Sequence, residues 1–391
     1  MPSWREARRI LAVRLDAMGD VLMTTPALRA LKALPARPHL ALLTSASGAA
    51  VARLVPEVDE IFVWEAPWMK ASKRAGAASD RAHVARLAAA GFDAAVIFTV
   101  YSQSPWPAAL AAHLAGIPLR LAHGRENPYQ LLSDWLPEPE PEHCVRHEVR
   151  RQLDLVAAVG ARTDEDRLSL RVPERVTRRV QQRLAGLALD PGRPWVLVHP
   201  GASAPSRRYP RELFAAVIDR LVARGWAAVE AVDPRDAEAP IGHAAAPCFA
   251  PATLAELAAL VSLASVVLAN NSGPAHVAAA MGTPVVVLYA LTNPQHTPWR
   301  VASEVLFQPV PCGFCYKSRC VAGHHACLSA VPPEVVAAAV ERRLLGSRAA
   351  PEGDTPCVEL SRARDPRGLD DGAPPAGLGE QTMVARPGSA A

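Results

Sequence analysis

Short runs of apolar residues alternate along the chain with longer stretches whose apolar residues recur at helical spacing. In the first part of the chain the runs that predict strands are 10–15, 39–44, 61–64, 95–99 and 119–122. The stretches that predict helices are 21–34, 48–55, 81–90, 107–115, 147–159 and 175–187. Parallel strands need a crossover connection, usually a helix, so this alternation predicts a parallel sheet with helices on both faces.

The same alternation restarts after the turn-rich segment 190–194, Asp-Pro-Gly-Arg-Pro. Here the expected strands are 195–198, 227–232, 266–268 and 285–289, and the expected helices are 211–224, 253–261, 274–281 and 332–345. We therefore predict two Rossmann-like α/β domains, over residues 1–188 and 189–345. Residues 346–391 carry few large apolar side chains, which predicts a disordered tail.

A polar turn follows the first predicted strand and contains Met18-Gly19-Asp20. Aspartate is a favourable residue at a helix start, so Asp20 as a simple helix cap is one interpretation. The other is a general base, because the carboxyl edge of a parallel sheet is where ligands bind. Asp16 is a competing carboxylate in the same turn.

The loop after the strand at 195–198 runs His-Pro-Gly-Ala-Ser-Ala-Pro-Ser-Arg-Arg-Tyr-Pro. Its small residues let the backbone approach an anion, Ser203 and Ser206 offer hydroxyl donors, and two arginines can hold phosphate oxygens. This composition predicts a phosphate site, with an ordinary exposed basic loop as the alternative.

A third polar turn, Asn270 to His276, leads from a buried strand into an alanine-rich helix that begins near Pro274. Free N–H groups and the positive dipole end of a helix attract phosphate, so Asn271, Ser272 and Gly273 are candidate phosphate contacts. A histidine in such a helix is more often packed than functional, but the place of His276 in the first turn favours an anion contact.

These three stretches together resemble glycosyltransferase family 9, the ADP-heptose:LPS heptosyltransferase family. The resemblance lies in RLDAMGDVLMTTPALRAL, HPGASAPSRRYPRELFAAVIDRL and NNSGPAHVAAAMGTPVVVLYALTNP, which span roughly residues 10–345 in the order and spacing of the family. It implies a GT-B fold, with the nucleotide-sugar donor on the C-terminal domain and the acceptor on the N-terminal domain. It also implies inverting transfer with no cofactor required for catalysis.

Matched to the family motifs, Asp20 is the expected general base. Arg208 falls where many members carry a lysine on the donor phosphates, while Ser272, Gly273 and His276 fall in the donor-binding motif. Two positions depart from the family pattern. Asn271 stands where many members have aspartate, and Tyr289-Ala290-Leu291-Thr292 replaces a turn that usually contains Gly-Pro.

Four of the seven cysteines cluster near the end of the second predicted domain, at Cys312, Cys315, Cys320 and Cys327. Four thiols within so short a stretch predict a structural metal site, with zinc ahead of an iron–sulfur cluster. The alternative is a set of free or disulfide-paired cysteines that stabilise a loop.

The net charge of +4 is too small for a nucleic-acid-binding surface but suits an anionic small molecule. The sequence contains no run of about 18 apolar residues and predicts no transmembrane helix, so we expect a cytoplasmic protein. The family resemblance implies ADP-heptose as donor and a lipid-linked saccharide as acceptor, which places the protein at the cytoplasmic face of the inner membrane. By charge alone, candidate acceptor contacts are Arg120, Arg125, Arg146, Arg150 and Arg151. Candidate contacts with an anionic membrane surface are Arg5, Arg8 and Arg9 with Trp4, although a solvated N-terminus is the favoured interpretation of that segment.

The leading hypothesis is transfer of a heptose, or a related sugar, to a lipopolysaccharide inner-core saccharide. A transferase that uses another nucleotide sugar is the first alternative. The second is a nucleotide-sugar-binding protein without transferase activity, which the neutral Asn271 favours. A dinucleotide-dependent oxidoreductase is disfavoured because neither domain begins with the spaced-glycine motif of such enzymes.

Overall fold

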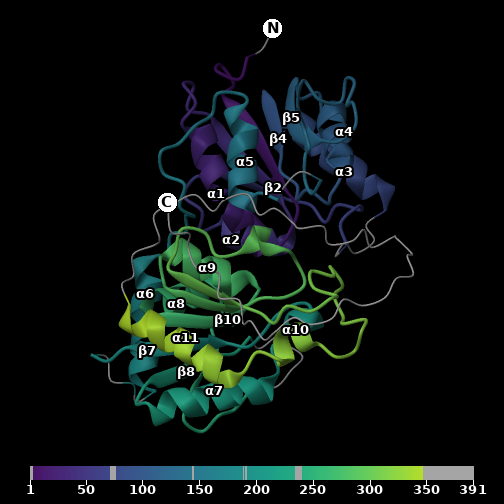
Figure 1. Cartoon of the computed structure of the whole chain (residues 1–391). Helices are drawn as coiled ribbons and strands as arrows, with labels where there is room; N and C mark the ends of the chain where they lie inside the picture. The colour runs from purple at the N-terminus through teal and green to yellow at the C-terminus, as the bar shows by residue number, and fades with distance from the viewer. Residues whose placement is uncertain are drawn as a thin grey trace, which may run out of the picture.

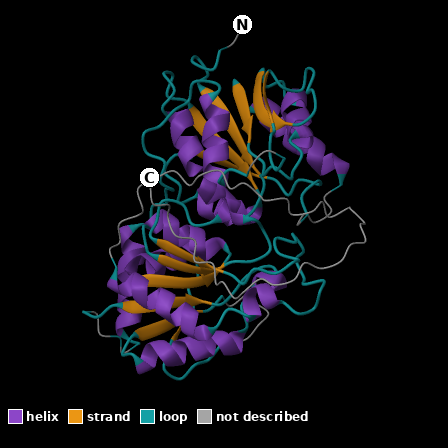
Figure 2. Cartoon of the chain, in the orientation of Figure 1, coloured by secondary structure: helices purple, strands orange, loops and turns teal. Residues whose placement is uncertain are grey.

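The computed structural model describes residues 3–70, 76–142, 145–187, 189, 192–233 and 240–346. These residues form two parallel six-stranded sheets, each with helices on its faces, stacked one above the other in Figures 1 and 2. The prediction of two α/β units with parallel sheets is confirmed. The predicted tail over 346–391 lies outside the described residues, except for Gly346.

The first sheet has the strand order β3-β2-β1-β4-β5-β6. Its strands are β1 Arg9–Arg14, β2 His39–Thr44, β3 Glu60–Val63, β4 Ala94–Ile97, β5 Leu119–Gly124 and β6 Asp134–Pro137. The helices between them are α1 Met18–Lys32, α2 Ala46–Ala52, α3 Ala77–Ala89 and α4 Trp106–Leu114, and α5 Glu148–Ala157 follows. This is the strand order of a Rossmann sheet, whose direction of winding changes between β1 and β4.

The second sheet has the order β12-β11-β10-β7-β8-β9, which is the same topology. Its strands are β7 Trp195–His199, β8 Ala227–Ala231, β9 Cys248–Phe249, β10 Val266–Asn270, β11 Val285–Leu288 and β12 Ser303–Leu306. The helices are α6 Glu174–Ala185, α7 Arg211–Ala223, α8 Leu254–Leu263, α9 Gly273–Met281, α10 Ala326–Ser329 and α11 Pro333–Leu345, with short 3₁₀ turns η1 Pro205–Arg207 and η2 Pro294–His296. Here the winding changes between β7 and β10.

Helix α6 belongs by packing to the second sheet, although it precedes the predicted domain boundary. Arg183 of α6 forms an ion pair of 2.8 Å with Glu256 of α8, and its guanidinium lies 4.0 Å from the centre of the Phe249 ring. Figure 1 shows α6 beside α8 in the lower half of the molecule. The domain limits 1–188 and 189–345 therefore stay a prediction, and this contact bears on where the boundary falls.

Three strands were not predicted, and all three lie at the edge of a sheet. They are β6, β9 and β12. An edge strand pairs on one side only and does not need a continuous apolar sequence. Pro137 ends β6, which an edge position tolerates because the missing N–H costs no ladder hydrogen bond there.

The polar turns singled out in the sequence follow β1, β7 and β10. These strands flank the points where the winding of each sheet changes direction, and open α/β sheets bind ligands at such points. The fold therefore brings the three turns to the edges where a ligand site is expected.

Candidate active site

The first turns of α1 and α9 touch across the boundary between the two sheets. A Cβ placed on Gly19 would lie 2.7 Å from Cδ2 of His276, and one placed on Gly273 would lie 2.5 Å from Cε of Met18. The two helix starts approach this closely because both positions are glycine. The contact places His276, from the second half of the chain, directly beside the turn that carries Asp20.

This contact gives a testable difference between two glycines. In Gly19→Ala the new methyl group meets the buried His276 ring, which lowers the free energy of unfolding by about 1–3 kcal/mol. This loss exceeds the gain from the higher helix propensity of alanine, which is at most about 1 kcal/mol. In Gly273→Ala it meets only the flexible end of Met18. We expect thermal unfolding to show a lower Tm for Gly19→Ala than for Gly273→Ala, and the reverse order would contradict the contact.

The carboxylate of Asp20 is fixed by two protein hydrogen bonds but remains partly open to solvent. Its Oδ2 accepts the backbone N–H of Ala17 at 3.1 Å, and its Oδ1 accepts from the Arg14 guanidinium at 3.1 Å. The side chain is 23% exposed. Burial acts to raise the pKa of Asp20, but the charge and hydrogen bond of Arg14, together with the His296 and His276 rings, outweigh burial and lower that pKa below its usual range. Asp20 is thus both a helix-capping residue and an ionised carboxylate.

Asp16, the competing carboxylate, lies in the same turn but is more enclosed. Its Oδ2 is 3.0 Å from Nε of Arg14, and its Oδ1 accepts a 2.5 Å hydrogen bond from the Gln103 amide. Burial raises the pKa of Asp16 to about 6, against the opposing effect of Arg14. The two aspartates of this turn therefore differ in charge state at mildly acidic pH.

The predicted phosphate loop after β7 is held by bonds within the loop and by bonds to the segment 317–318. Ser206 is buried, donates its hydroxyl to the Lys317 carbonyl at 2.7 Å and donates its backbone N–H to the Ser318 carbonyl at 3.1 Å. Arg208 donates from Nε to the Ala202 carbonyl at 2.8 Å. Ser203 is exposed. These contacts favour a role for Ser206 and Arg208 in shaping the loop.

Sequence reasoning did not single out Arg207, the neighbour of Arg208. Its buried Nε has no hydrogen-bond partner among the described residues, and its charge acts on both Asp20 and Tyr289. Arg207 is therefore the arginine of this loop whose charge acts on Asp20. The signal in the sequence was the Arg-Arg pair, which does not say which of two adjacent side chains turns inward.

The turn after β10 is tied to neighbouring loops through its amides. Asn270 donates to the Pro200 carbonyl at 2.6 Å and accepts the Tyr209 N–H at 3.0 Å. The Ser272 hydroxyl lies 3.2 Å from the Asn270 carbonyl oxygen. These bonds place the start of α9 beside the loop that carries Arg207.

The two departures from the family pattern contact each other. The Asn271 amide donates to the Ala290 carbonyl at 3.2 Å and to the Thr292 hydroxyl at 3.3 Å. An ionised aspartate could not make the bond to the Ala290 carbonyl, because a carboxylate only accepts. Asn271 therefore matches the altered 289–292 turn, and this pairing accounts for the amide without any loss of the site.

One buried histidine, His276, and one partly buried histidine, His296, act on the charge of Asp20 from the second half of the chain. Burial lowers the pKa of His276 to about 4 and also lowers that of His296, so both rings are neutral at pH 7. Nδ1 of His276 and Nε2 of His296 have no hydrogen-bond partner among the described residues. His296, in η2, was not predicted from the sequence.

The cysteine cluster lies in the loop beside Ser206, and Cys312, Cys315, Cys320 and Cys327 are all free thiols. The part of the chain that the structure describes contains no group of three or more His, Cys, Asp or Glu side chains arranged to hold a metal ion. The predicted zinc or iron–sulfur site therefore has no structural support.

Most of the arginines predicted to contact the acceptor already have hydrogen-bond partners within the protein. Arg120 donates to the carbonyls of Leu131 and Gln130, and Arg125 donates to that of Tyr101. Arg146 binds Glu140, while Arg151 binds Glu138 and also donates to the Thr99 carbonyl. These four side chains stabilise the loop between β5 and α5.

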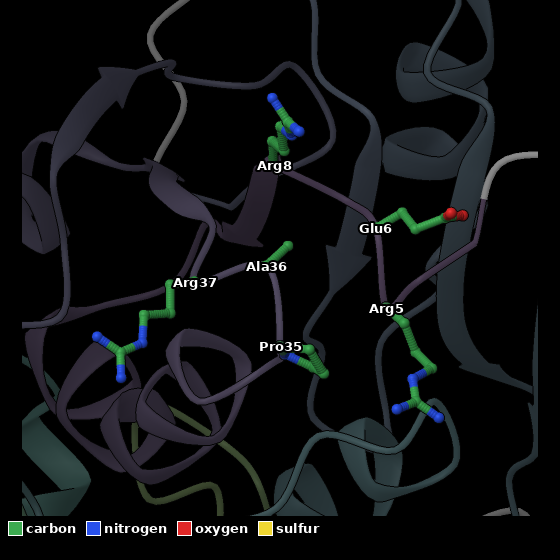
Figure 3. A pocket seen from close by; sticks show the side chains of 6 residues that line it. All are labelled: Arg5, Glu6, Arg8, Pro35, Ala36 and Arg37. Carbon is green, nitrogen blue, oxygen red and sulfur yellow. The ribbon is translucent and has the colours of Figure 1, made fainter.

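A separate basic hollow of about 640 Å³ lies at the amino end of β1, the end opposite the Asp20 turn. Figure 3 shows Arg5, Arg8 and Arg37 around Pro35 and Ala36. Trp4, predicted to contact a membrane, is instead buried and donates its indole N–H to Asp134 at 2.8 Å. No helix among the described residues combines the length and apolarity needed to cross a bilayer.

Comparison with known protein families shows which family this chain belongs to. The family model for glycosyltransferase family 9 (heptosyltransferase) matches residues 81–326. The chain belongs to this family. Lipopolysaccharide heptosyltransferase 3 of Escherichia coli is 28% identical over 169 residues, which cover 41% of this chain and 48%, about half, of that protein.

Solved structures extend the likeness over most of this family 9 chain. A family 9 glycosyltransferase from Veillonella parvula has a TM-score of 0.72 at 22% identity and covers 88% of this chain and 98% of its own. The ADP-heptose LPS heptosyltransferase II of E. coli has a TM-score of 0.66 at 22% identity and covers 86% and 98%. The predicted GT-B fold is confirmed.

Proposed function

We propose that this family 9 protein transfers a heptose from ADP-heptose to a saccharide of the lipopolysaccharide inner core, with inversion at the anomeric carbon and Asp20 as general base. The observation that carries the proposal is the ionised, partly exposed Asp20 carboxylate beside the start of α9 and Arg207. Membership of family 9 supports the reaction class, and the names of the relatives support the donor and acceptor.

In the proposed reaction the acceptor hydroxyl approaches Asp20 and gives up its proton to the free lone pairs of that carboxylate. The hydroxyl oxygen attacks the anomeric carbon from the face opposite the phosphate. A new C–O bond forms as the bond to the phosphate oxygen breaks, and the electron pair leaves with ADP. No cofactor takes part in these steps.

Negative charge grows on the departing diphosphate, so the donor half of the site needs fixed positive charge and N–H donors. Arg207 is placed to supply the charge, and the free N–H groups at the start of α9, around Ser272 and Gly273, supply donors. The neutral His276 ring can donate or accept one hydrogen bond there. Ser203, exposed in the same loop, remains a proposed phosphate contact, and Arg208 is proposed as a weaker one than Arg207 because its Nε is already held by the Ala202 carbonyl.

The acceptor is proposed to be a lipid-linked saccharide, which places the reaction at the cytoplasmic face of the inner membrane. The support is chemical, because the inner core of lipopolysaccharide is built on a lipid. Sedimentation with vesicles that contain the lipid-linked acceptor, compared with vesicles without it, tests this placement. Equal sedimentation with both would contradict recognition of the acceptor.

Nucleotide specificity is the first test of the proposed donor. A ligand at 100 times its Kd stabilises the folded state by about 2.7 kcal/mol, so ADP is expected to raise Tm, while GDP, UDP and CMP at the same concentration are not. A shift with another nucleotide alone would favour a different nucleotide sugar. If ADP does shift Tm but ADP-heptose is not consumed with any inner-core acceptor, a binding protein without transferase activity becomes the better description.

A further inference from the structure

A single buried arginine behind the Asp20 turn contacts three carboxylates. Arg14, the last residue of β1, is fully buried. Its Nη2 donates to Asp20 at 3.1 Å, its Nη1 donates to Glu148 at 2.9 Å, and its Nε lies 3.0 Å from Asp16. Because the guanidinium is a rigid planar fork, these contacts fix the three carboxylates relative to one another.

Glu148 cannot reach a substrate, because its side chain is fully buried. It is the first residue of α5, and besides Arg14 it accepts a 2.7 Å hydrogen bond from the Gln152 amide. The residue before it, His147, donates from Nε2 to the Thr297 carbonyl at 2.9 Å in the second half of the chain. A buried carboxylate is costly unless it is paired, so the position of Glu148 needs an explanation beyond packing.

We propose that Arg14 and Glu148 are positioning residues for the proton-accepting carboxylate. Arg14 holds Asp20 ionised and oriented, and Glu148 locks the guanidinium in the orientation that reaches Asp20. This inference rests on the proposed role of Asp20 as general base. It adds to that proposal a buried ion pair from β1 and α5 that never touches the substrate.

The charged and titratable groups around Asp20 determine what each substitution should do. They come from every element packed against the turn: Arg14, Asp16, Glu148, His276, His296 and Arg207. Removal of the Arg14 charge raises the pKa of both aspartates, because an opposite charge favours the ionised form. Removal of the Glu148 charge lowers the pKa of Asp16, because a like charge is lost. If Arg14 and Glu148 had a purely structural role, their removal would not shift the pKa of Asp16 in opposite directions.

The test is a pH titration of the full-length, ligand-free protein by NMR of ¹³C-labelled aspartate carboxyls, with signals assigned by Asp20→Asn and Asp16→Asn. In Arg14→Gln we expect the midpoints of Asp16 and Asp20 to rise by about 1–3 pH units. In Glu148→Gln we expect the Asp16 midpoint to fall, because a like charge is lost, and the Asp20 midpoint to rise by less than in Arg14→Gln, because the Arg14 charge remains but is no longer locked onto Asp20. Unchanged midpoints of both aspartates in Arg14→Gln would overturn the inference. A rise of the Asp16 midpoint in both variants would also overturn it.

Glu57→Gln is the matched control, because Glu57 is also a mostly buried carboxylate, paired with Arg29 at 3.0 Å. Arg29 lies nine residues along α1 from Asp20, or about 13 Å at 1.5 Å per residue, so this variant should move neither midpoint. If Arg14→Gln does not fold, Arg14→Lys replaces it. Lysine keeps the charge but lacks the fork, so kcat should fall while the Asp20 midpoint moves less than one pH unit, and an unchanged kcat would count against the inference.

The two proposals fail in different ways. If Asp20→Asn transfers sugar at the normal rate while the midpoints shift as expected, the electrostatic arrangement stands and the general-base role is wrong. If Asp20→Asn is inactive but the midpoints do not move, the positioning role of Arg14 and Glu148 is wrong.

Discussion

Replacing Asp20 with asparagine is expected to lower kcat for sugar transfer by about 10²–10⁴-fold, the usual contribution of a general base. The asparagine amide keeps the size of the side chain, and its oxygen can still accept the Ala17 N–H that caps α1. It cannot take a proton from the acceptor hydroxyl. Because the amide NH2 cannot accept the bond from Arg14, we expect a lower Tm but near-normal nucleotide binding by the folded protein, with a large loss of turnover measured by release of ADP.

Asp16→Asn is the matched control for this experiment. Asp16 stands in the same turn and also contacts Arg14, but its other oxygen is held by Gln103 and its side chain is 12% exposed, against 23% for Asp20. We expect a much smaller loss of kcat in Asp16→Asn. If Asp16→Asn instead showed the larger loss, the carboxylate at 16 would replace the one at 20 as the proposed base.

The sequence was sufficient to locate the turns that form the candidate site. A carboxylate after β1, a basic loop after β7 and a glycine turn after β10 each follow an apolar strand, and parallel sheets gather such turns at one edge. Apolar alternation also located both central strands of each sheet, because those strands are buried on both faces. The edge strands β6, β9 and β12 left no comparable pattern, since they carry polar residues or are very short.

What the sequence could not provide was the direction of individual side chains. Arg207 and Arg208 are adjacent and chemically identical, and only the structure shows that Arg207, the last residue of the short 3₁₀ turn η1, has a buried Nε and a charge that acts on Asp20. The arginines between β5 and α5 formed a basic cluster by count, yet nearby carbonyls and glutamates hold Arg120, Arg125, Arg146 and Arg151. Charge along a sequence does not show which charges are already neutralised by partners far away in the chain.

Residues that compensate one another also cannot be recognised when each motif is considered separately. Asn271 viewed alone weakens the match to family 9, and so does the 289–292 turn. In the structure the Asn271 amide donates to both Ala290 and Thr292 of that turn. The two departures therefore form one local rearrangement, and they give less reason to prefer a binding protein without activity.

Arg207→Gln is expected to lower kcat by about 10²–10³-fold, which is the usual effect of removing one preorganised group that stabilises developing charge. Its guanidinium lies within electrostatic range of Asp20, and its buried Nε has no hydrogen-bond partner among the described residues, so it is available to the leaving diphosphate. Arg208→Gln is the matched control, because Nε of Arg208 already donates to the Ala202 carbonyl and should affect mainly the loop. Steady-state kinetics with ADP-heptose would separate them.

Because diphosphate charge grows as the sugar bond breaks, loss of Arg207 should act on kcat more than on the KM for the donor. Arg207→Lys should recover part of the loss, since an ammonium group restores the charge without the bidentate geometry. A larger effect on kcat from Arg208→Gln than from Arg207→Gln would return the phosphate role to Arg208, as the family motif implies. It would also mean that the loop rearranges when the donor binds, because the Ala202 carbonyl holds Nε of Arg208 in this structure.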